Sequence, residues 1–248
     1  MSENIVYGKN SVVEYLRSMP DQVEKVYVYE NLGSSDTINE IFELIKKNKI
    51  PFTKADKNKL HSLSEGGNHQ GIVLTLSSQP YSELDDIFKK AKQKNELPFI
   101  IILDSVNDPH NFGSIIRTAE FAGAHGIIVP KRNNVGITAA VNKVSCGAAA
   151  YLPIVKVSNL NYTIDKLKKE NIWVVGADCS AKKSYDKVDY KMPVAILLGS
   201  EGFGFSRILK ESCDFLVKIP QRGNVSSLNV GVSAGIMIYE VVRQRSRE

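Results

Sequence analysis

The hydrophobic positions of this chain fall into two successive patterns of alternating strand-like and helix-like segments. In the first pattern, short runs rich in Val, Ile and Tyr alternate with segments whose apolar residues recur every three or four positions. This alternation predicts a small α/β unit over residues 1–76. Its expected elements are a helix over 11–17, a strand over 23–29, a helix over 37–47, a strand over 52–54, a helix over 57–63 and a strand over 71–76.

The second pattern begins at Phe99 and consists of fully apolar runs separated by helix-like segments. Strands that are apolar on both faces are typical of a mostly parallel sheet covered by helices. We therefore expect a larger α/β domain over residues 98–248. Its expected strands are 99–103, 126–129, 152–155, 172–175, 194–198 and 215–219. The polar segment 77–97 between the two patterns is interpreted as a linker, within which residues 81–92 have helical spacing.

The loop over residues 219–229 has the composition of a ligand-binding loop. Pro220 and Gly223 end the preceding apolar run, and Ser226, Ser227 and Asn229 supply short hydrogen-bonding side chains before a helix. Ser and Asn also cap helices in ordinary connections. Read alone, this loop fits a ligand site and a plain strand-to-helix connection equally well.

A glycine-rich loop follows the apolar run 194–198. Gly199, Gly202 and Gly204 allow the backbone to approach a ligand closely, whereas Glu201 places negative charge where a phosphate cradle would avoid it. The loop matches neither GxGxxG nor the GK[ST] of a phosphate loop, which disfavours a dinucleotide or a nucleoside triphosphate. Glu201 could instead cap the following helix.

A third polar loop follows the run 99–103 and leads into a helix expected to begin near Asn111 or Ser114 and to stop at Gly123. Arg117 would then lie in the first turns of this helix, where the helix dipole disfavours a cation unless an anionic group meets it. The alternative is a surface ion pair between Arg117 and Glu120.

Charge and cysteine usage narrow the function classes. Residues 1–76 contain 9 basic and 10 acidic groups, whereas residues 98–248 contain 19 and 13, an excess that suits a polyanionic partner. No run is long enough to cross a membrane and no signal-peptide pattern begins the chain, so we expect a soluble, cytoplasmic protein. Cys146, Cys179 and Cys213 form no CxxC pair, which disfavours a zinc site, and are expected to be buried packing residues.

Together the three loops resemble the three motifs of the SpoU/TrmH family of RNA ribose 2′-O-methyltransferases, within the SPOUT superfamily. Asn111 and Arg117 match its N-x-x-x-x-x-R element, residues 198–202 its L-G-x-E-G element, and residues 219–229 its I-P-x-x-G-x-x-x-S-L-N element. The motifs occur in family order. The segment NHQGIVLTL, residues 68–76, is similar to the ribosomal-protein-like substrate domain of members that modify 23S rRNA.

The resemblance implies a fold that the apolar pattern does not. The pattern alone predicts a Rossmann-like sheet, and knots are almost absent from known folds. SPOUT members nevertheless tie a deep trefoil knot at the C-terminal end of a mostly parallel sheet with helices on both faces, and the knot loops hold S-adenosylmethionine. The cofactor-binding residues implied here are Leu198, Gly199, Gly202, Ile219, Pro220 and Leu228.

The resemblance also implies a reaction. A methyl group on a sulfonium is already activated, so its transfer to a ribose 2′-hydroxyl needs in-line placement and removal of a proton, without a metal. Arg117 is expected to orient the ribose or its 3′-phosphate and to stabilise the developing alkoxide, because a guanidinium remains protonated. Asn111, Glu201, Ser227 and Asn229 complete the implied catalytic set, with Glu201 either a base or an ion-pair partner of Arg117.

Two partners are expected. Small and apolar residues surround most of the helix over 230–243, and family members dimerise through this region, which places the motif-one arginine of one protomer near the cofactor pocket of the other. We expect a homodimer with Tyr239 and Glu240 at or near the interface. The expected RNA is 23S rRNA, at a guanosine of the peptidyl-transferase P loop, since tRNA-modifying members usually lack the N-terminal domain.

Three other functions are weighed against this one. Another rRNA or tRNA ribose is the nearest alternative within the family. A non-catalytic RNA-binding ribosome-assembly factor of the same fold belongs to a different class, and intact motif residues weigh against it. A nicotinamide dehydrogenase fits the parallel sheet alone but would require the missing GxGxxG.

Overall fold

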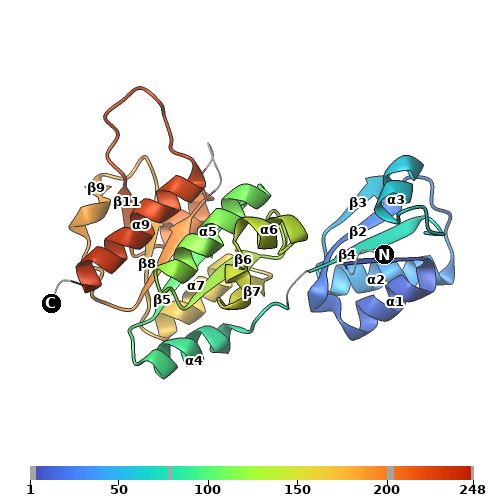
Figure 1. Ribbon diagram of the computed structural model, residues 1–248, viewed down its shortest axis with the longest axis horizontal. Helices are drawn as coiled ribbons and strands as arrows, with labels where there is room; N and C mark the ends of the chain where they lie inside the picture. The colour runs from blue at the N-terminus through green and yellow to red at the C-terminus, as the bar shows by residue number, and fades with distance from the viewer. Residues whose placement is uncertain (1–3, 78–79, 200–203, 247–248) are drawn as a thin grey trace. The chain divides into compact units, whose positions relative to one another are not determined.

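The computed structural model describes residues 4–77, 80–199 and 204–246, and divides the chain into two compact units, Met1–Tyr81 and Ser82–Glu248 (Figure 1). Each unit has its own sheet and its own apolar core. The segment 77–97, expected as a linker, contains helix α4 (Leu84–Lys94). Ile87 and Ala91 of α4 are buried within the second unit.

The first unit is a four-stranded sheet in the order β1-β4-β2-β3. Helices α1 and α2 cover one face, where Leu16 and Ile41 are fully buried, and α3 packs Leu60 on the other face. All six expected elements are present, and β1, which was not predicted, pairs antiparallel with β4. The elements are β1 (Ile5–Tyr7), α1 (Lys9–Ser18), β2 (Val23–Tyr29), α2 (Asp36–Lys47), β3 (Phe52–Ala55), α3 (Lys57–Leu63) and β4 (Ile72–Leu76).

The second unit is a seven-stranded sheet in the order β7-β6-β5-β10-β8-β11-β9, and all of its strand pairs are parallel. The predicted mostly parallel α/β sheet is therefore confirmed. Its strands are β5 (Phe99–Leu103), β6 (Gly126–Pro130), β7 (Ile154–Val157), β8 (Trp173–Ala177), β9 (Lys183–Ser184), β10 (Val194–Leu198) and β11 (Phe215–Lys218). Its remaining helices are α5 (Pro109–Phe121), α6 (Ala139–Val144), α7 (Leu160–Lys169), α8 (Arg207–Ser212) and α9 (Val230–Arg245).

Helices cover both faces of this sheet. On one face, Ile87 of α4, Ile164 of α7 and Leu209 of α8 share a core with strand residues such as Ala195 and Leu197. On the other face, α5 and α9 lie side by side (Figure 1). Because β8 lies between β10 and β11 and the three strands are parallel, their carboxyl ends meet at one edge of the sheet. Ligands bind at such edges in open α/β folds.

The expectation that all three cysteines are buried was wrong. Cys146 and Cys179 are exposed, and Cys213 is half-buried. Cys146 lies in the turn after α6 with a positive φ of 53°, and Cys179 lies in the loop after β8, so neither belongs to the packed face of an element. Burial raises the pKa of the Cys213 thiol to about 12, so this thiol is unreactive at neutral pH.

The stability of the second unit depends on pH through His125. Its ring is buried, Nδ1 accepts a hydrogen bond from the Phe99 N–H at 3.0 Å, and Nε2 lies 3.1 Å from Glu96 Oε2. Burial lowers the pKa of His125, despite the opposing contribution of Glu96, and Lys94 and Arg245 lower it further. The contact with Glu96 is therefore a hydrogen bond from a neutral ring.

We expect the second unit to lose stability as the pH falls below about 6.5, the ordinary pKa of histidine. The unfolded chain binds a proton at His125 more readily than the folded chain, so the contribution is fully present above that pKa and is lost on acidification. Urea unfolding at pH 7.5 and pH 5.5 measures this slope. His125→Asn should be less stable at pH 7.5 but should show a shallower slope. Equal slopes in the two proteins would contradict this assignment.

Candidate cofactor pocket and motif residues

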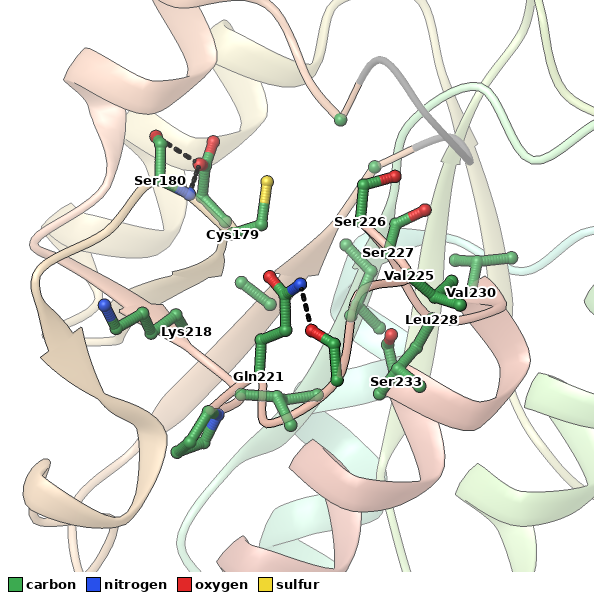
Figure 2. Close-up of a pocket in the computed structure, with 18 of the residues that line it drawn as sticks. Cys179, Ser180, Lys218, Gln221, Val225, Ser226, Ser227, Leu228, Val230 and Ser233 are labelled. Atoms are coloured by element: carbon green, nitrogen blue, oxygen red, sulfur yellow. Dashed lines mark hydrogen bonds between the residues drawn. The ribbon is translucent and has the colours of Figure 1, made fainter.

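A pocket of about 910 Å³ lies at the carboxyl ends of β8, β10 and β11. Its volume falls in the range of about 300–1,000 Å³ that is typical of small-molecule sites. Six of the residues implied by the family resemblance as cofactor-binding or catalytic line it: Leu198, Gly199, Ile219, Pro220, Ser227 and Leu228. Figure 2 shows Cys179 and Ser180 on one side of the pocket, with Ser226, Ser227 and Leu228 across from them.

The loop from Ile219 to Asn229 forms the largest part of the pocket lining. It begins after β11 ends at Lys218. Within the loop, Gln221 Nε2 donates a hydrogen bond to the Gly223 carbonyl oxygen at 2.7 Å. Leu228 remains 47% exposed, which leaves an apolar side chain available to a ligand. The prediction that this loop faces a cavity fits its position in the structure.

Gly199 sits at the closest approach of the pocket's backbone segments. A Cβ atom at this position would lie 2.3 Å from the Gly204 carbonyl carbon, too close for any side chain. Gly204 itself has a positive φ of 65°. The close contact requires glycine at position 199, and the positive φ favours glycine at position 204. Glu201 and Gly202, also predicted site residues, lie outside the described residues.

Asn111 and Asn229 join the first and third motifs. Asn229 Nδ2 donates a hydrogen bond to Asn111 Oδ1 at 2.9 Å, across 118 positions of sequence. Asn229 also caps α9, because its Oδ1 accepts from the Gly231 and Val232 N–H groups. The pair fixes the starts of α5 and α9 against each other, directly beside the pocket loop.

Arg117 lies on the exposed side of α5 and does not line the pocket of its own protomer. Helix α5 begins at Pro109, earlier than expected, because Asp108 caps it by accepting from the Asn111 N–H. Arg117 is therefore in the third turn, and the expectation that it lies against the positive end of the helix dipole was wrong. Among the described residues, Arg117 makes no hydrogen bond or ion pair, so the alternative of a surface pair with Glu120 is also wrong.

One wall of the pocket was not predicted from the sequence: it consists of Ala177 at the end of β8 and the following loop from Asp178 to Ser180. Asp178 in this loop forms an ion pair with Lys210 of α8. Burial works to raise the pKa of Asp178, but hydrogen bonds from Lys210 and Ser180 outweigh burial and lower it. A sequence signal was present, because Asp178 and Ser180 follow a buried strand just as the recognised loops do.

The electrostatic character of the pocket is set by few charges. Its described lining contains three cationic side chains, Lys210, Lys218 and Arg222, and the carboxylate of Asp178. Among the described residues, including those of the pocket, no three His, Cys, Asp or Glu side chains are grouped so that they could hold a metal ion. Nor is any described helix both long and apolar enough to cross a membrane.

Comparison with known proteins identifies the family. The SpoU rRNA Methylase family matches residues 98–239, and the substrate-binding domain of RNA 2′-O ribose methyltransferases matches residues 5–82. The chain belongs to the SpoU/TrmH family of RNA methyltransferases. A family member of Bacillus subtilis, YacO, named as a TrmH family tRNA/rRNA methyltransferase, is 45% identical over 241 residues, which are 97% of this chain and 96% of YacO.

Two solved SpoU/TrmH structures are similar to this chain, one over nearly all of it and one over part of it. The SpoU methyltransferase AviRb from Streptomyces viridochromogenes, in complex with AdoMet, is 25% identical with a TM-score of 0.61, over 97% of this chain and 90% of AviRb. The TrmH/SpoU tRNA modifying enzyme of A. aeolicus is 27% identical with a TM-score of 0.55, but covers only 64% of this chain and 84% of its own. AviRb is therefore similar to this chain across both of its units.

Proposed function

We propose that this protein transfers a methyl group from S-adenosylmethionine to a ribose 2′-hydroxyl of 23S rRNA. The observation that carries the proposal is the convergence of the second and third family motifs on one pocket, with the Asn111–Asn229 hydrogen bond of the first and third motifs beside it. A guanosine of the peptidyl-transferase P loop is the proposed target.

The pocket fits the cofactor by its size and by the nature of its lining. Backbone groups of Gly199 and Ile219 are available to the adenosine, Leu228 offers an apolar surface to the ring, and the lining cations suit the carboxylate of the methionine part. When bound, the cofactor supplies an activated methyl group on sulfur. We also propose that the loops after β10 and β11 form the trefoil knot of the family.

The chain's own residues have the task of placing the ribose. Arg117 orients the ribose or its 3′-phosphate and stabilises the developing alkoxide, because its guanidinium is exposed and makes no internal bond among the described residues. Asn111 and Asn229 hold the ends of α5 and α9 in place, and Ser227 extends the polar edge of the pocket. Glu201 is proposed as a base or as an ion-pair partner of Arg117.

A homodimer completes the site in this proposal. Arg117 is not among the described residues that line the pocket of its own protomer, which supports a role for the arginine of a second copy there. Exposed apolar side chains mark the candidate surface: Phe121 at the end of α5 is 80% exposed, and Val232 and Tyr239, seven residues apart on one face of α9, are 52% and 44% exposed. Glu240 is buried and accepts hydrogen bonds from Arg243 and Gln244, so its side chain stabilises α9 and is not part of this exposed surface.

Ribosomal RNA is preferred over tRNA because of the first unit. The first unit corresponds to the substrate-binding domain, and a tRNA-modifying relative matches only 64% of the chain. The nearly balanced charge of residues 1–76 suits recognition of RNA shape, whereas the basic second unit supplies attraction to phosphates.

Protection of Cys179 tests cofactor binding in this pocket. Cys179 is exposed and lines the pocket, so bound S-adenosylmethionine or its demethylated product should slow its reaction with a thiol reagent. The assay uses Cys146→Ser, which removes the other exposed thiol, while Cys213 stays unreactive. Calorimetry measures the affinity in parallel. Binding of a nicotinamide dinucleotide in place of these compounds, or binding of neither, would refute the proposal.

A further inference from the structure

The buried carboxylate of Asp178 has both of its oxygens occupied within the protein. Its side chain is only 5% exposed. Oδ1 accepts hydrogen bonds from the Ser180 N–H at 2.8 Å and from the Ser180 hydroxyl at 2.5 Å, and Oδ2 lies 2.5 Å from Lys210 Nζ. Because each oxygen of this carboxylate has a partner within the protein, Asp178 holds the loop around it in place.

The Asp178–Lys210 ion pair links the segments that converge on the pocket. Lys210 comes from α8, the helix that follows the glycine-rich loop after β10. The Asp178 N–H donates to the Val217 carbonyl of β11 at 2.8 Å, and the Ala181 N–H donates back to the Asp178 carbonyl at 3.1 Å. One residue thus ties the end of β8 to β11 and to α8. Both members of the ion pair line the pocket.

We propose that the Asp178–Lys210 ion pair positions the loop over residues 178–181 as a wall of the cofactor pocket, and that its main effect is on cofactor affinity. This inference rests on the proposed methyltransferase function. Removing Lys210 would leave a buried, uncompensated carboxylate. The short loop can relieve that cost by turning Asp178 towards water, whereas strands β8 and β11, which are paired along their lengths, cannot move as easily. Such a turn carries Cys179 and Ser180 out of the pocket wall.

A second ion pair at the opposite end of β8 provides a matched control. Lys168 Nζ lies 2.9 Å from Asp214 Oδ1, and Lys168 is 33% exposed, the same value as for Lys210. Asp214 also accepts a backbone hydrogen bond, from the Val174 N–H at 2.8 Å. Neither Lys168 nor Asp214 lines the pocket. The two lysines therefore have the same exposure and each pairs with an aspartate, but Asp214 is 21% exposed and Asp178 only 5%, and only the Asp178–Lys210 pair lines the pocket.

The test compares Lys210→Met with Lys168→Met in the full-length chain. Calorimetry should show the affinity for S-adenosylhomocysteine falling by about 10-fold or more in Lys210→Met. The affinity should be unchanged in Lys168→Met, whose melting temperature should fall less than that of Lys210→Met because Asp214 is more exposed than Asp178. Lys210→Arg should regain most of the affinity. In methylation assays, Lys210→Met should raise KM for the cofactor and retain kcat at saturation.

Two further measurements separate the possible failures. In the Cys146→Ser background, Lys210→Met should lose cofactor protection of Cys179 at ligand concentrations that protect the parent. Ser180→Ala, which removes a single hydroxyl at the surface and preserves folding, should weaken binding less than Lys210→Met does. Equal affinities in Lys210→Met and Lys168→Met, with a parent that binds, would overturn this inference. A parent protein that fails to bind would instead refute the proposed function.

Discussion

Replacing Arg117 by alanine should lower kcat for RNA methylation by about 10²- to 10³-fold, the usual effect of removing one group that stabilises developing charge. Cofactor affinity should stay unchanged, because Arg117 does not line the pocket of its own protomer. Stability should change by only about 0.5 kcal/mol or less, since the side chain is exposed and makes no internal bond among the described residues. Single-turnover methylation, calorimetry and thermal unfolding measure the three quantities.

Arg207→Ala is the control for loss of an exposed positive charge. Arg207 is 90% exposed and pairs with Glu211 on the same helix, so its loss should leave turnover unchanged. Near-normal turnover in Arg117→Ala would remove Arg117 from the catalytic site.

Mixed dimers can show whether Arg117 acts across the dimer. Gly199→Ala should block the pocket, because its Cβ has no room beside Gly204. Co-expression of Arg117→Ala with Gly199→Ala should then restore activity that neither variant has alone, since one site of each heterodimer combines an intact pocket with an intact arginine. Absence of restored activity in purified heterodimers would place Arg117 and the pocket in the same protomer.

Removing the first unit should abolish methylation of the RNA target and leave cofactor binding intact. A chain that begins at Ser82 retains the whole second unit, including α4. Its cofactor affinity and its dimer mass should match those of the full chain, while RNA methylation falls below detection. Methylation at the full-length rate would show that residues 1–81 do not select the RNA. In the full-length protein, RNA affinity should fall steeply with salt because of the basic second unit.

The position of the truncation matters for this experiment. A chain that begins at Glu96 lacks α4, whose Ile87 is fully buried against the sheet and would contact any side chain placed at Gly126. Loss of a single buried isoleucine side chain to alanine costs about 2–5 kcal/mol. The shorter chain should therefore unfold at a clearly lower temperature than the chain that begins at Ser82, which separates a folding defect from a loss of RNA selection.

Three strands could be predicted closely from the sequence, two of them buried on both faces and one with alternating burial. The strands over 23–29, 99–103 and 194–198 have their predicted bounds, because continuous or alternating Val, Ile and Leu positions identify a strand without further context. Strands β1 and β9 were missed, since they contain three and two residues and exist only through pairing with distant strands. Their formation depends on tertiary contacts that no local pattern encodes.

The family motifs identified residues that lie together in the structure, whereas the roles of these residues stay predictions. Gly199, Ile219 and Leu228 were predicted to form one pocket and do line one. Asp178 was missed because its role depends on β8 lying between β10 and β11, an order that follows from the crossover connections. The start of α5 was predicted too late. Asp108 caps the helix, and Pro109 occupies the first helical position, where a proline is tolerated.

The most direct test of the proposed function is a map of ribose 2′-O-methyl groups in rRNA and tRNA from cells with and without this gene. We predict the loss of a single mark in 23S rRNA, restored by the intact gene and not by the Arg117→Ala variant. Loss of a tRNA mark instead would refute the proposed substrate. Unchanged marks in both RNA classes would contradict the enzymatic account and favour a non-catalytic RNA-binding factor.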